Sequence, residues 1–115
     1  MHADTFTALV VDNQDGAVRA EIRSVERSGL PPGEVLVRVS YSSVNYKDGL
    51  ALTGQGKIIR QYPMVPGVDL AGVVEESHTP EFAPGDQVVM TGCGVGEYRW
   101  GGYAELASVN GEWLV

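Results

Sequence analysis

The chain has 115 residues, of which 43% are hydrophobic and 20% are charged, so its composition favours one globular domain over a disordered chain. Its formal net charge of −7 argues against nucleic acid or an anionic membrane surface as a partner, because both need a basic face. The single cysteine excludes an internal disulfide, and with two distant histidines it makes no standard zinc site.

Two strands joined by a turn are predicted at the N-terminus. Phe6 to Val11 is a short apolar strand candidate, and residues 12–16 (DNQDG) predict a turn that ends on Asp-Gly. From Val18 to Val25 apolar and polar residues nearly alternate, which favours a half-buried strand paired back as a hairpin. A Pro-Pro-Gly segment at 31–33 then breaks the chain.

The clearest strand begins at Val35, because three valines at alternate positions up to Val39 share one face. A short helix is predicted from Asn45 to Leu52, with Asn45 as its N-cap and Asp48 at its positive N-terminal end. The glycines at positions 54 and 56 end this helix.

The second half of the chain alternates apolar segments with turns. An apolar run follows Pro66-Gly67 and is broken only by Asp69. Further along come a turn at 84–86 (PGD), a strand from Gln87 to Thr91, a glycine-rich loop at 92–96 and a strand candidate from Tyr103 to Val109. Short strands at regular spacing favour a mainly β barrel or sandwich with one short helix.

Two groups of polar residues are candidates for chemistry. Residues Tyr41 to Asp48 place polar side chains where a strand enters a helix, and the free N–H groups of such junctions often line pockets. Capping by Asn45 and ordinary packing of the tyrosines is the alternative. Asp69 lies in an apolar strand, where burying an unpaired carboxylate is costly. It is therefore a cleft carboxylate, a member of a structural ion pair or an exposed edge residue.

Two other segments carry weaker signals. Residues 92–97 are not a dinucleotide fingerprint, because Glu97 occupies the third glycine position and no βαβ unit follows, so a mobile loop is expected. Lys57 and Arg60, with Lys47 nearby, either attract anionic phosphate groups or form a solvated surface.

Five short motifs follow one another along nearly the whole chain. They are YSSVNYKD at 41–48, PMVPGVDLAG at 63–72, PGD at 84–86, GVGE at 94–97 and WGG at 100–102. This ordered set resembles the acryloyl-CoA reductase and quinone oxidoreductase-like branch of the medium-chain dehydrogenase/reductases. The resemblance implies a GroES-like, partly open β-barrel with one or two short helices over residues 1–115. Such a domain normally precedes a Rossmann domain for NADPH, which is absent from this chain.

The positions that hold zinc ligands in zinc alcohol dehydrogenases differ here. Asn45 falls near the position of a catalytic cysteine, and Val68 stands where a histidine would be. A valine cannot coordinate zinc. The cysteine-rich lobe that holds a structural zinc is missing too. The resemblance therefore implies the zinc-free branch, with no metal ligand in this chain.

The resemblance also implies a reaction, in which hydride passes from NADPH to the β-carbon of an activated alkene. Asn45 and Tyr46 are expected to face the nicotinamide and the substrate as catalytic and cofactor-binding residues. Asp69 would lie beside them and organise the site. The proton for the α-carbon comes from Tyr46 or from water. The rim of the substrate pocket is expected to include Tyr41, Arg60 and Trp100.

Two hypotheses for the function stay open. The first is the N-terminal catalytic domain of a reductase of α,β-unsaturated thioesters, such as acryloyl-CoA, or of ketones and quinones. Lys57 and Arg60 would suit a phosphate of CoA or of NADPH, which favours a CoA thioester. The second is a stand-alone GroES-like binding or assembly module, or a non-catalytic fragment. The missing cofactor half supports the second hypothesis.

Other expectations concern the protein as a whole. The chain closes on the apolar residues 113–115, which suggests that another element continues it, and these 115 residues alone are not expected to turn over substrate. No signal peptide or membrane-spanning run is visible, so a cytoplasmic location is expected. The resemblance allows a homodimer of the full-length protein.

Overall fold

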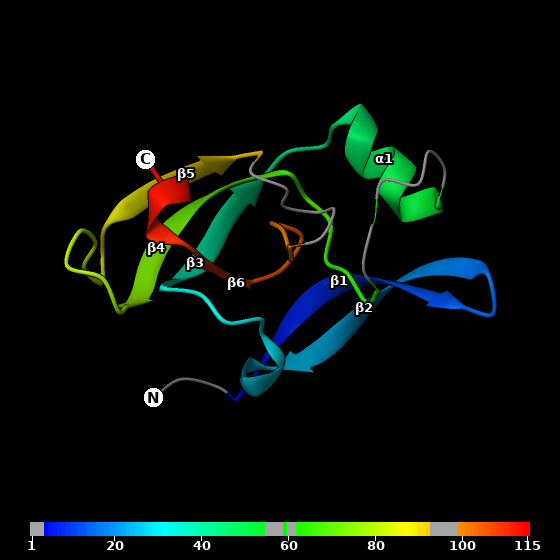
Figure 1. Cartoon of the computed structure of the whole chain (residues 1–115), viewed down its shortest axis with the longest axis horizontal. Coiled ribbons are helices and arrows are strands. Elements are labelled where there is room, and N and C mark those ends of the chain that lie inside the picture. Colours follow the sequence, from blue (N-terminus) through cyan, green and yellow to red (C-terminus); the bar gives the residue numbers. More distant parts are fainter. Residues whose placement is uncertain (1–3, 55–58, 60–61, 93–98) are drawn as a thin grey trace.

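A four-stranded antiparallel sheet and a separate hairpin are the main elements of the described residues. A computed structural model describes residues 4–54, 59, 62–92 and 99–115. The hairpin strands are β1 (Thr5–Gln14) and β2 (Ala17–Glu26), and the sheet, in the order β5-β4-β3-β6, contains β3 (Val35–Ser42), β4 (Asp69–Ser77), β5 (Gln87–Thr91) and β6 (Leu106–Val109). Helix α1 (Tyr46–Thr53) and the 3₁₀ turns η1 (Arg27–Gly29) and η3 (Gly111–Trp113) complete the described elements. The two sheets do not close on each other (Figure 1), which confirms the partly open, mainly β architecture.

The N-terminal hairpin is longer and more exposed than predicted. β1 and β2 pair from Thr5↔Glu26 to Gln14↔Ala17, so the five-residue turn predicted at 12–16 is wrong. Only Asp15 (φ 53°) and Gly16 (φ 84°) form the turn, and positive φ at both central residues matches the right-handed twist of the strands. The half-burial predicted for the second strand is also wrong at its centre, where Ile22 is 76% exposed, because β1 carries the core-facing residues.

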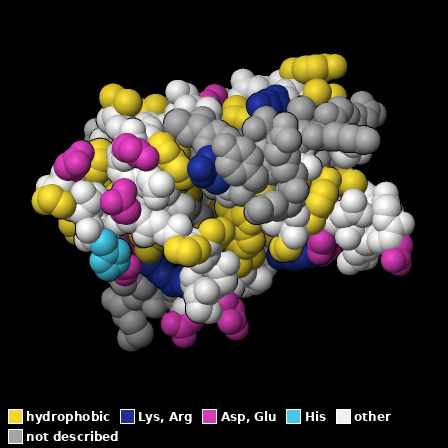
Figure 2. Space-filling model, viewed as in Figure 1, with side chains coloured by type: hydrophobic (Ala, Val, Ile, Leu, Met, Phe, Trp, Pro, Cys, Tyr) yellow, Lys and Arg dark blue, Asp and Glu magenta, His cyan; other side chains and the backbone are white. Residues whose placement is uncertain are grey.

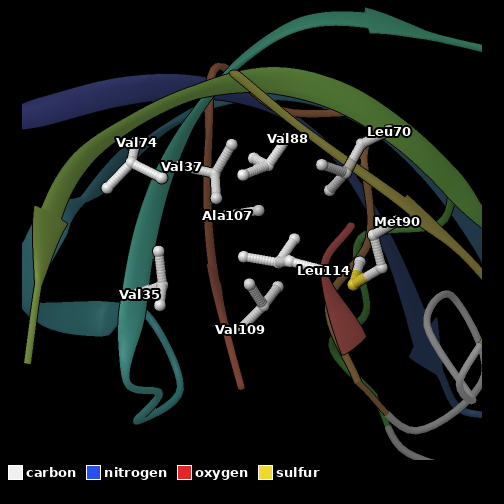
Figure 3. Packing of buried hydrophobic residues seen from close by; sticks show 9 residues of the cluster. All are labelled: Val35, Val37, Leu70, Val74, Val88, Met90, Ala107, Val109 and Leu114. Atoms are coloured by element: carbon white, nitrogen blue, oxygen red, sulfur yellow. The ribbon is translucent and has the colours of Figure 1, made fainter. Parts of the chain in front are cut away.

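The main core lies on one face of the four-stranded sheet. Val35 and Val37 are fully buried, as the valine alternation in β3 predicted. Figure 3 shows their side chains converging with those of β4, β5, β6 and the C-terminal Leu114. Two smaller clusters join β1 to the segment around Val65 and to α1. Apolar side chains also reach the surface between the sheet and the hairpin (Figure 2).

The short helix forms where the sequence predicts it. Asn45 is its N-cap, and Asp48 completes a capping box, in which each side chain bonds the other residue's backbone N–H. Gly54 ends the helix in the left-handed conformation (φ 76°). The second predicted stop, Gly56, lies outside the described residues.

Two strands were predicted from Gln87 to Thr91 and from Tyr103 to Val109. The first is confirmed, and the second is shorter than predicted. β5 has the predicted bounds, Gln87–Thr91. The strand predicted from Tyr103 begins only at Leu106, because the Tyr103 backbone bonds elsewhere. Its N–H donates to the Pro66 carbonyl (3.0 Å), and its own carbonyl accepts from the Leu9 N–H (2.8 Å).

Two further contacts tie the outer parts of the sheet. The Glu75 side chain on β4 is 6% exposed and pairs with both Arg27 and Arg38, one carboxylate oxygen to each. At the edge of the sheet, Val89 on β5 and Val115 exchange two backbone hydrogen bonds of 3.1 and 2.9 Å. The C-terminal residue thus continues the sheet by one antiparallel pair.

Candidate active site

The polar residues at the end of β3 meet the start of β4. The Ser43 hydroxyl donates to Asp69 Oδ2 (2.9 Å), and Asn45 Nδ2 donates to Ser43 Oγ (2.9 Å). Asn45 Nδ2 also lies 3.4 Å from Asp69 Oδ2. All three residues are half-buried. The structure therefore brings together Asn45 and Asp69, which are 24 positions apart in the sequence.

A buried carboxylate lies beneath this pair. Asp48 is 1% exposed. Its Oδ1 accepts from the backbone N–H groups of Gly67 and Val68, both at 3.1 Å. Its Oδ2 accepts from the Asn45 backbone N–H (3.3 Å) and from Asn45 Nδ2 (3.2 Å). The sequence predicts Asp48 only at the helix start, because the Asn-x-x-Asp spacing indicates a cap and carries no sign of the contacts with Gly67 and Val68.

Close backbone packing holds the segment before Asp69 in place. A Cβ on Gly102 would lie 2.6 Å from the Asp69 carbonyl oxygen and 2.9 Å from Ser42 Oγ. Gly67 has φ 103°, and a Cβ there would lie 2.8 Å from the Tyr103 ring. Because only glycine leaves this space, the chain around Gly102 packs directly against the segment that leads into β4.

Tyr103 connects this packing to the polar cluster. Its hydroxyl donates to the Ser43 carbonyl oxygen (2.9 Å). Burial raises the pKa of Tyr103 to about 12, and the nearby negative charges of Asp48 and Asp69 add to the shift. The phenol therefore stays protonated at neutral pH. Sequence reasoning treated Tyr103 only as a strand residue, and nothing local marks its role.

The other predicted site residues lie in different surroundings. Tyr46 is 85% exposed and Tyr41 is 76% exposed, so both present their rings to solvent beside the cluster. Trp100 is half-buried between two apolar clusters and donates to the Pro63 carbonyl (3.1 Å). Arg60 lies outside the described residues, as do Lys57 and all of the loop predicted from Gly92 except Gly92 itself.

An open groove adjoins the cluster on the hairpin side. It has a volume of about 360 Å³ and is lined by Leu9, Ile22, Tyr41, Ser42 and Tyr103, among others. Its lining is mostly apolar. Tyr103 therefore borders both this groove and the polar cluster.

Two kinds of feature are absent from the part of the chain that the structure describes. No group of three or more His, Cys, Asp or Glu side chains in these residues is arranged to hold a metal ion. No helix among them has the length and apolarity needed to cross a bilayer.

The mainly β architecture, with two sheets that do not close, agrees with a partly open GroES-like domain. Residues 31–115 match the model of this family, the alcohol dehydrogenase GroES-like domain, and the chain belongs to it.

Three relatives extend this assignment. The acrylyl-CoA reductase AcuI of Ruegeria pomeroyi is 50% identical over 112 residues, covering 96% of this chain and 34% of the relative. The yhdH oxidoreductase of Salmonella enterica, solved in complex with NADP, is 54% identical with a TM-score of 0.92, over 95% of this chain and 34% of that one. Bacillus subtilis yhfP, solved with NAD bound and provisionally named a quinone oxidoreductase, is 43% identical with a TM-score of 0.92, over 98% and 34% of the two chains. The chain thus spans about a third of the length of these relatives.

Proposed function

We propose that this chain is the substrate-side domain of an NADPH-dependent oxidoreductase that reduces the C=C bond of α,β-unsaturated thioesters such as acryloyl-CoA. The observation that carries the proposal is the Ser43–Asn45–Asp69 cluster, which lies at the helix start beside the exposed ring of Tyr46. The similarity to an acrylyl-CoA reductase supports the thioester, and the NADP complex of a relative supports the cofactor. A Rossmann domain that holds this cofactor belongs to the same proposal.

The residues at the cluster suit the chemistry of a nicotinamide group. The exposed Tyr46 ring offers a flat apolar surface next to the half-buried Asn45 amide, and a carboxamide-bearing ring needs both kinds of contact. When bound, the cofactor supplies the hydride for the β-carbon. Asn45 and Tyr46 are the residues of this chain that would orient the cofactor and the substrate.

Asp69 and Tyr46 take different roles in the proposed reaction. Within the described residues, Asp69 Oδ2 accepts from Ser43 and Asn45, and Oδ1 has no donor. Asp69 would therefore accept a hydrogen bond from a hydroxyl or amide N–H of a bound ligand. The Tyr46 hydroxyl would donate to the thioester carbonyl, which becomes more negative as the hydride arrives. The proton for the α-carbon comes from Tyr46 or from water.

The proposal is tested with the enzyme whose coding sequence contains this chain. NADPH oxidation is expected with acryloyl-CoA, and Tyr46→Phe is expected to lower kcat at least 10-fold, an order of magnitude typical of a lost acid or polarising group. Because Tyr46 is 85% exposed, its replacement should leave stability unchanged. Tyr62→Phe is the matched control, since Tyr62 is half-buried against an apolar cluster. Absence of NADPH oxidation with thioester, ketone and quinone substrates would overturn the proposal.

A quinone substrate is the second candidate, favoured by the provisional name of the Bacillus subtilis relative. The dependence of KM on ionic strength distinguishes a CoA thioester substrate from a quinone. If Lys57 and Arg60 bind the phosphates of CoA, KM for acryloyl-CoA should rise with ionic strength, whereas KM for an uncharged quinone should not.

The domain arrangement has its own test. A downstream Gly-rich βαβ sequence in the reading frame past Val115 would support the proposed two-domain reductase. Its absence would favour a stand-alone binding or assembly module. A cytoplasmic location and a homodimer of the whole enzyme remain part of the proposal, and cell fractionation and sedimentation of the full-length protein test them.

A further inference from the structure

We infer that Asp48 is a positioning residue that fixes the Asn45 amide and, through the backbone of Gly67 and Val68, the Asp69 carboxylate. The inference rests on the proposed function for its consequence in catalysis, but its structural part does not. Asp48 is buried, and its four hydrogen-bond contacts reach both sides of the site.

The first part of the inference concerns the orientation of the Asn45 amide. Its side-chain oxygen accepts from the Asp48 backbone N–H in the capping box, while Nδ2 faces Asp48 Oδ2 at 3.2 Å and Asp69 Oδ2 at 3.4 Å. Turning the amide over would set its oxygen against two carboxylate oxygens, which offer no proton. Asp48 therefore keeps an amide donor, and not an acceptor, directed at Asp69.

The second part concerns the backbone that leads into β4. Asp48 Oδ1 accepts from the N–H groups of Gly67 and Val68, the two residues immediately before Asp69. Gly67 has φ 103°, a conformation that needs outside contacts to select it. By holding these two N–H groups, Asp48 sets where β4 begins and hence where the Asp69 side chain lies.

A carboxylate is needed for both parts at once. Each Asp48 oxygen faces donors only, two on each side. An amide at this position accepts at one atom and would turn its NH₂ group towards either Asn45 or the Gly67 and Val68 N–H groups. Asp48→Asn therefore releases one side of the site while changing the volume of the side chain little.

Glu75 provides a matched control on the same strand. Its side chain is 6% exposed and is also bonded at both oxygens, to Arg27 and Arg38. It lies six residues beyond Asp69 along β4, which corresponds to about 20 Å of extended strand. Glu75→Gln thus perturbs a largely buried carboxylate without touching the candidate site.

The structural arm of the test follows the Asn45 side chain by NMR in the ¹⁵N-labelled full-length protein. In the wild type the Asn45 NH₂ group should exchange its hydrogens slowly with solvent, and the Gly67 and Val68 amides should be protected. Asp48→Asn should abolish the protection on at least one side, and Glu75→Gln should leave both sides unchanged. An unprotected Asn45 NH₂ group in the wild type would overturn the inference, even if no Asp48 variant folds.

The kinetic arm uses the whole reductase with NADPH and acryloyl-CoA. Asp48→Asn should lower kcat by about 100-fold, the scale of a misplaced site group, with a smaller change in KM. Asp48→Glu, which keeps the charge but moves it by one methylene, should recover part of this loss. Equal losses in Asp48→Asn and Glu75→Gln would reduce Asp48 to a stability role and overturn the inference. A wild-type enzyme without turnover would defeat the proposed function alone, because the NMR arm still decides the position of Asn45.

Discussion

Tyr103 and Ser43 lie 60 positions apart, yet the Tyr103 hydroxyl donates a 2.9 Å hydrogen bond to the Ser43 carbonyl oxygen. The bond ties the segment before β6 to the end of β3. The Ser43 side-chain hydroxyl in turn donates to Asp69. The hydrogen bond from Tyr103 therefore fixes the backbone of the residue that contacts Asp69.

Removing this bond should weaken the fold by a measurable amount. Tyr103→Phe keeps the ring and leaves a half-buried carbonyl without its donor, so the free energy of unfolding should fall by about 1 kcal/mol. Urea unfolding followed by tryptophan fluorescence measures the change. Tyr41→Phe, at a ring that is 76% exposed, should change it by much less. Equal losses in the two variants would contradict the assigned role of the Tyr103 hydroxyl.

The same tyrosine should make stability depend on alkaline pH. Its pKa is raised from 10.0 to about 12 in the folded chain, mainly by burial. A raised pKa favours the protonated form in the fold, so the contribution is complete below pH 10 and is lost as the pH rises towards 12. Absorbance at 295 nm should show a titration step near pH 12 that is missing in Tyr103→Phe. A Tyr103 step near pH 10 would contradict this prediction.

Replacing Gly72 and Gly49 by alanine should change the stability of the fold in opposite directions. A Cβ on Gly72 in β4 would collide with the Arg38 carbonyl oxygen on the paired strand, so Gly72→Ala should destabilise the fold by about 1 to 3 kcal/mol. A Cβ on Gly49 in α1 would meet no atom within 4 Å. Gly49→Ala should stabilise by about 0.5 to 1 kcal/mol, because alanine favours the helix. Thermal unfolding of both variants tests the pair.

Alanine substitutions at the neighbouring residues Leu114 and Val115 should also differ clearly in their effect on stability. Leu114 is 8% exposed and belongs to the main core, so Leu114→Ala should cost about 2 to 4 kcal/mol. Val115 is 91% exposed, and Val115→Ala should change stability little. Chemical unfolding of the two variants measures the difference. A small loss for Leu114→Ala would mean that the C-terminal turn does not pack on the sheet.

Local features of the sequence were sufficient for some elements and not for others. The helix start at Asn45 and the bounds of β5 follow from capping and turn residues that act within a few positions. Ile22 was placed wrongly because alternation alone does not say which hairpin strand faces the core. Tyr103 was missed because its partner depends on how distant segments pack.

The candidate site shows the same division. The motif resemblance led to Asn45 and Asp69, and the fold places them within hydrogen-bonding reach of each other. The part played by Asp48 needed the fold, because the Gly67 and Val68 N–H groups are 19 and 20 positions away from it. The catalytic role of Tyr46 stays a prediction, and so does the place of Tyr41, Arg60 and Trp100 at the rim of the substrate pocket.

The backbone pair between Val89 and Val115 has a practical consequence for anyone attaching a label to this protein. Val115 hydrogen-bonds the edge of β5 through both its N–H and its carbonyl, so its own backbone occupies a strand edge that would otherwise be open to water and to other chains. A fluorophore attached to the side chain at position 115 should therefore report fraying of β5 before the core opens.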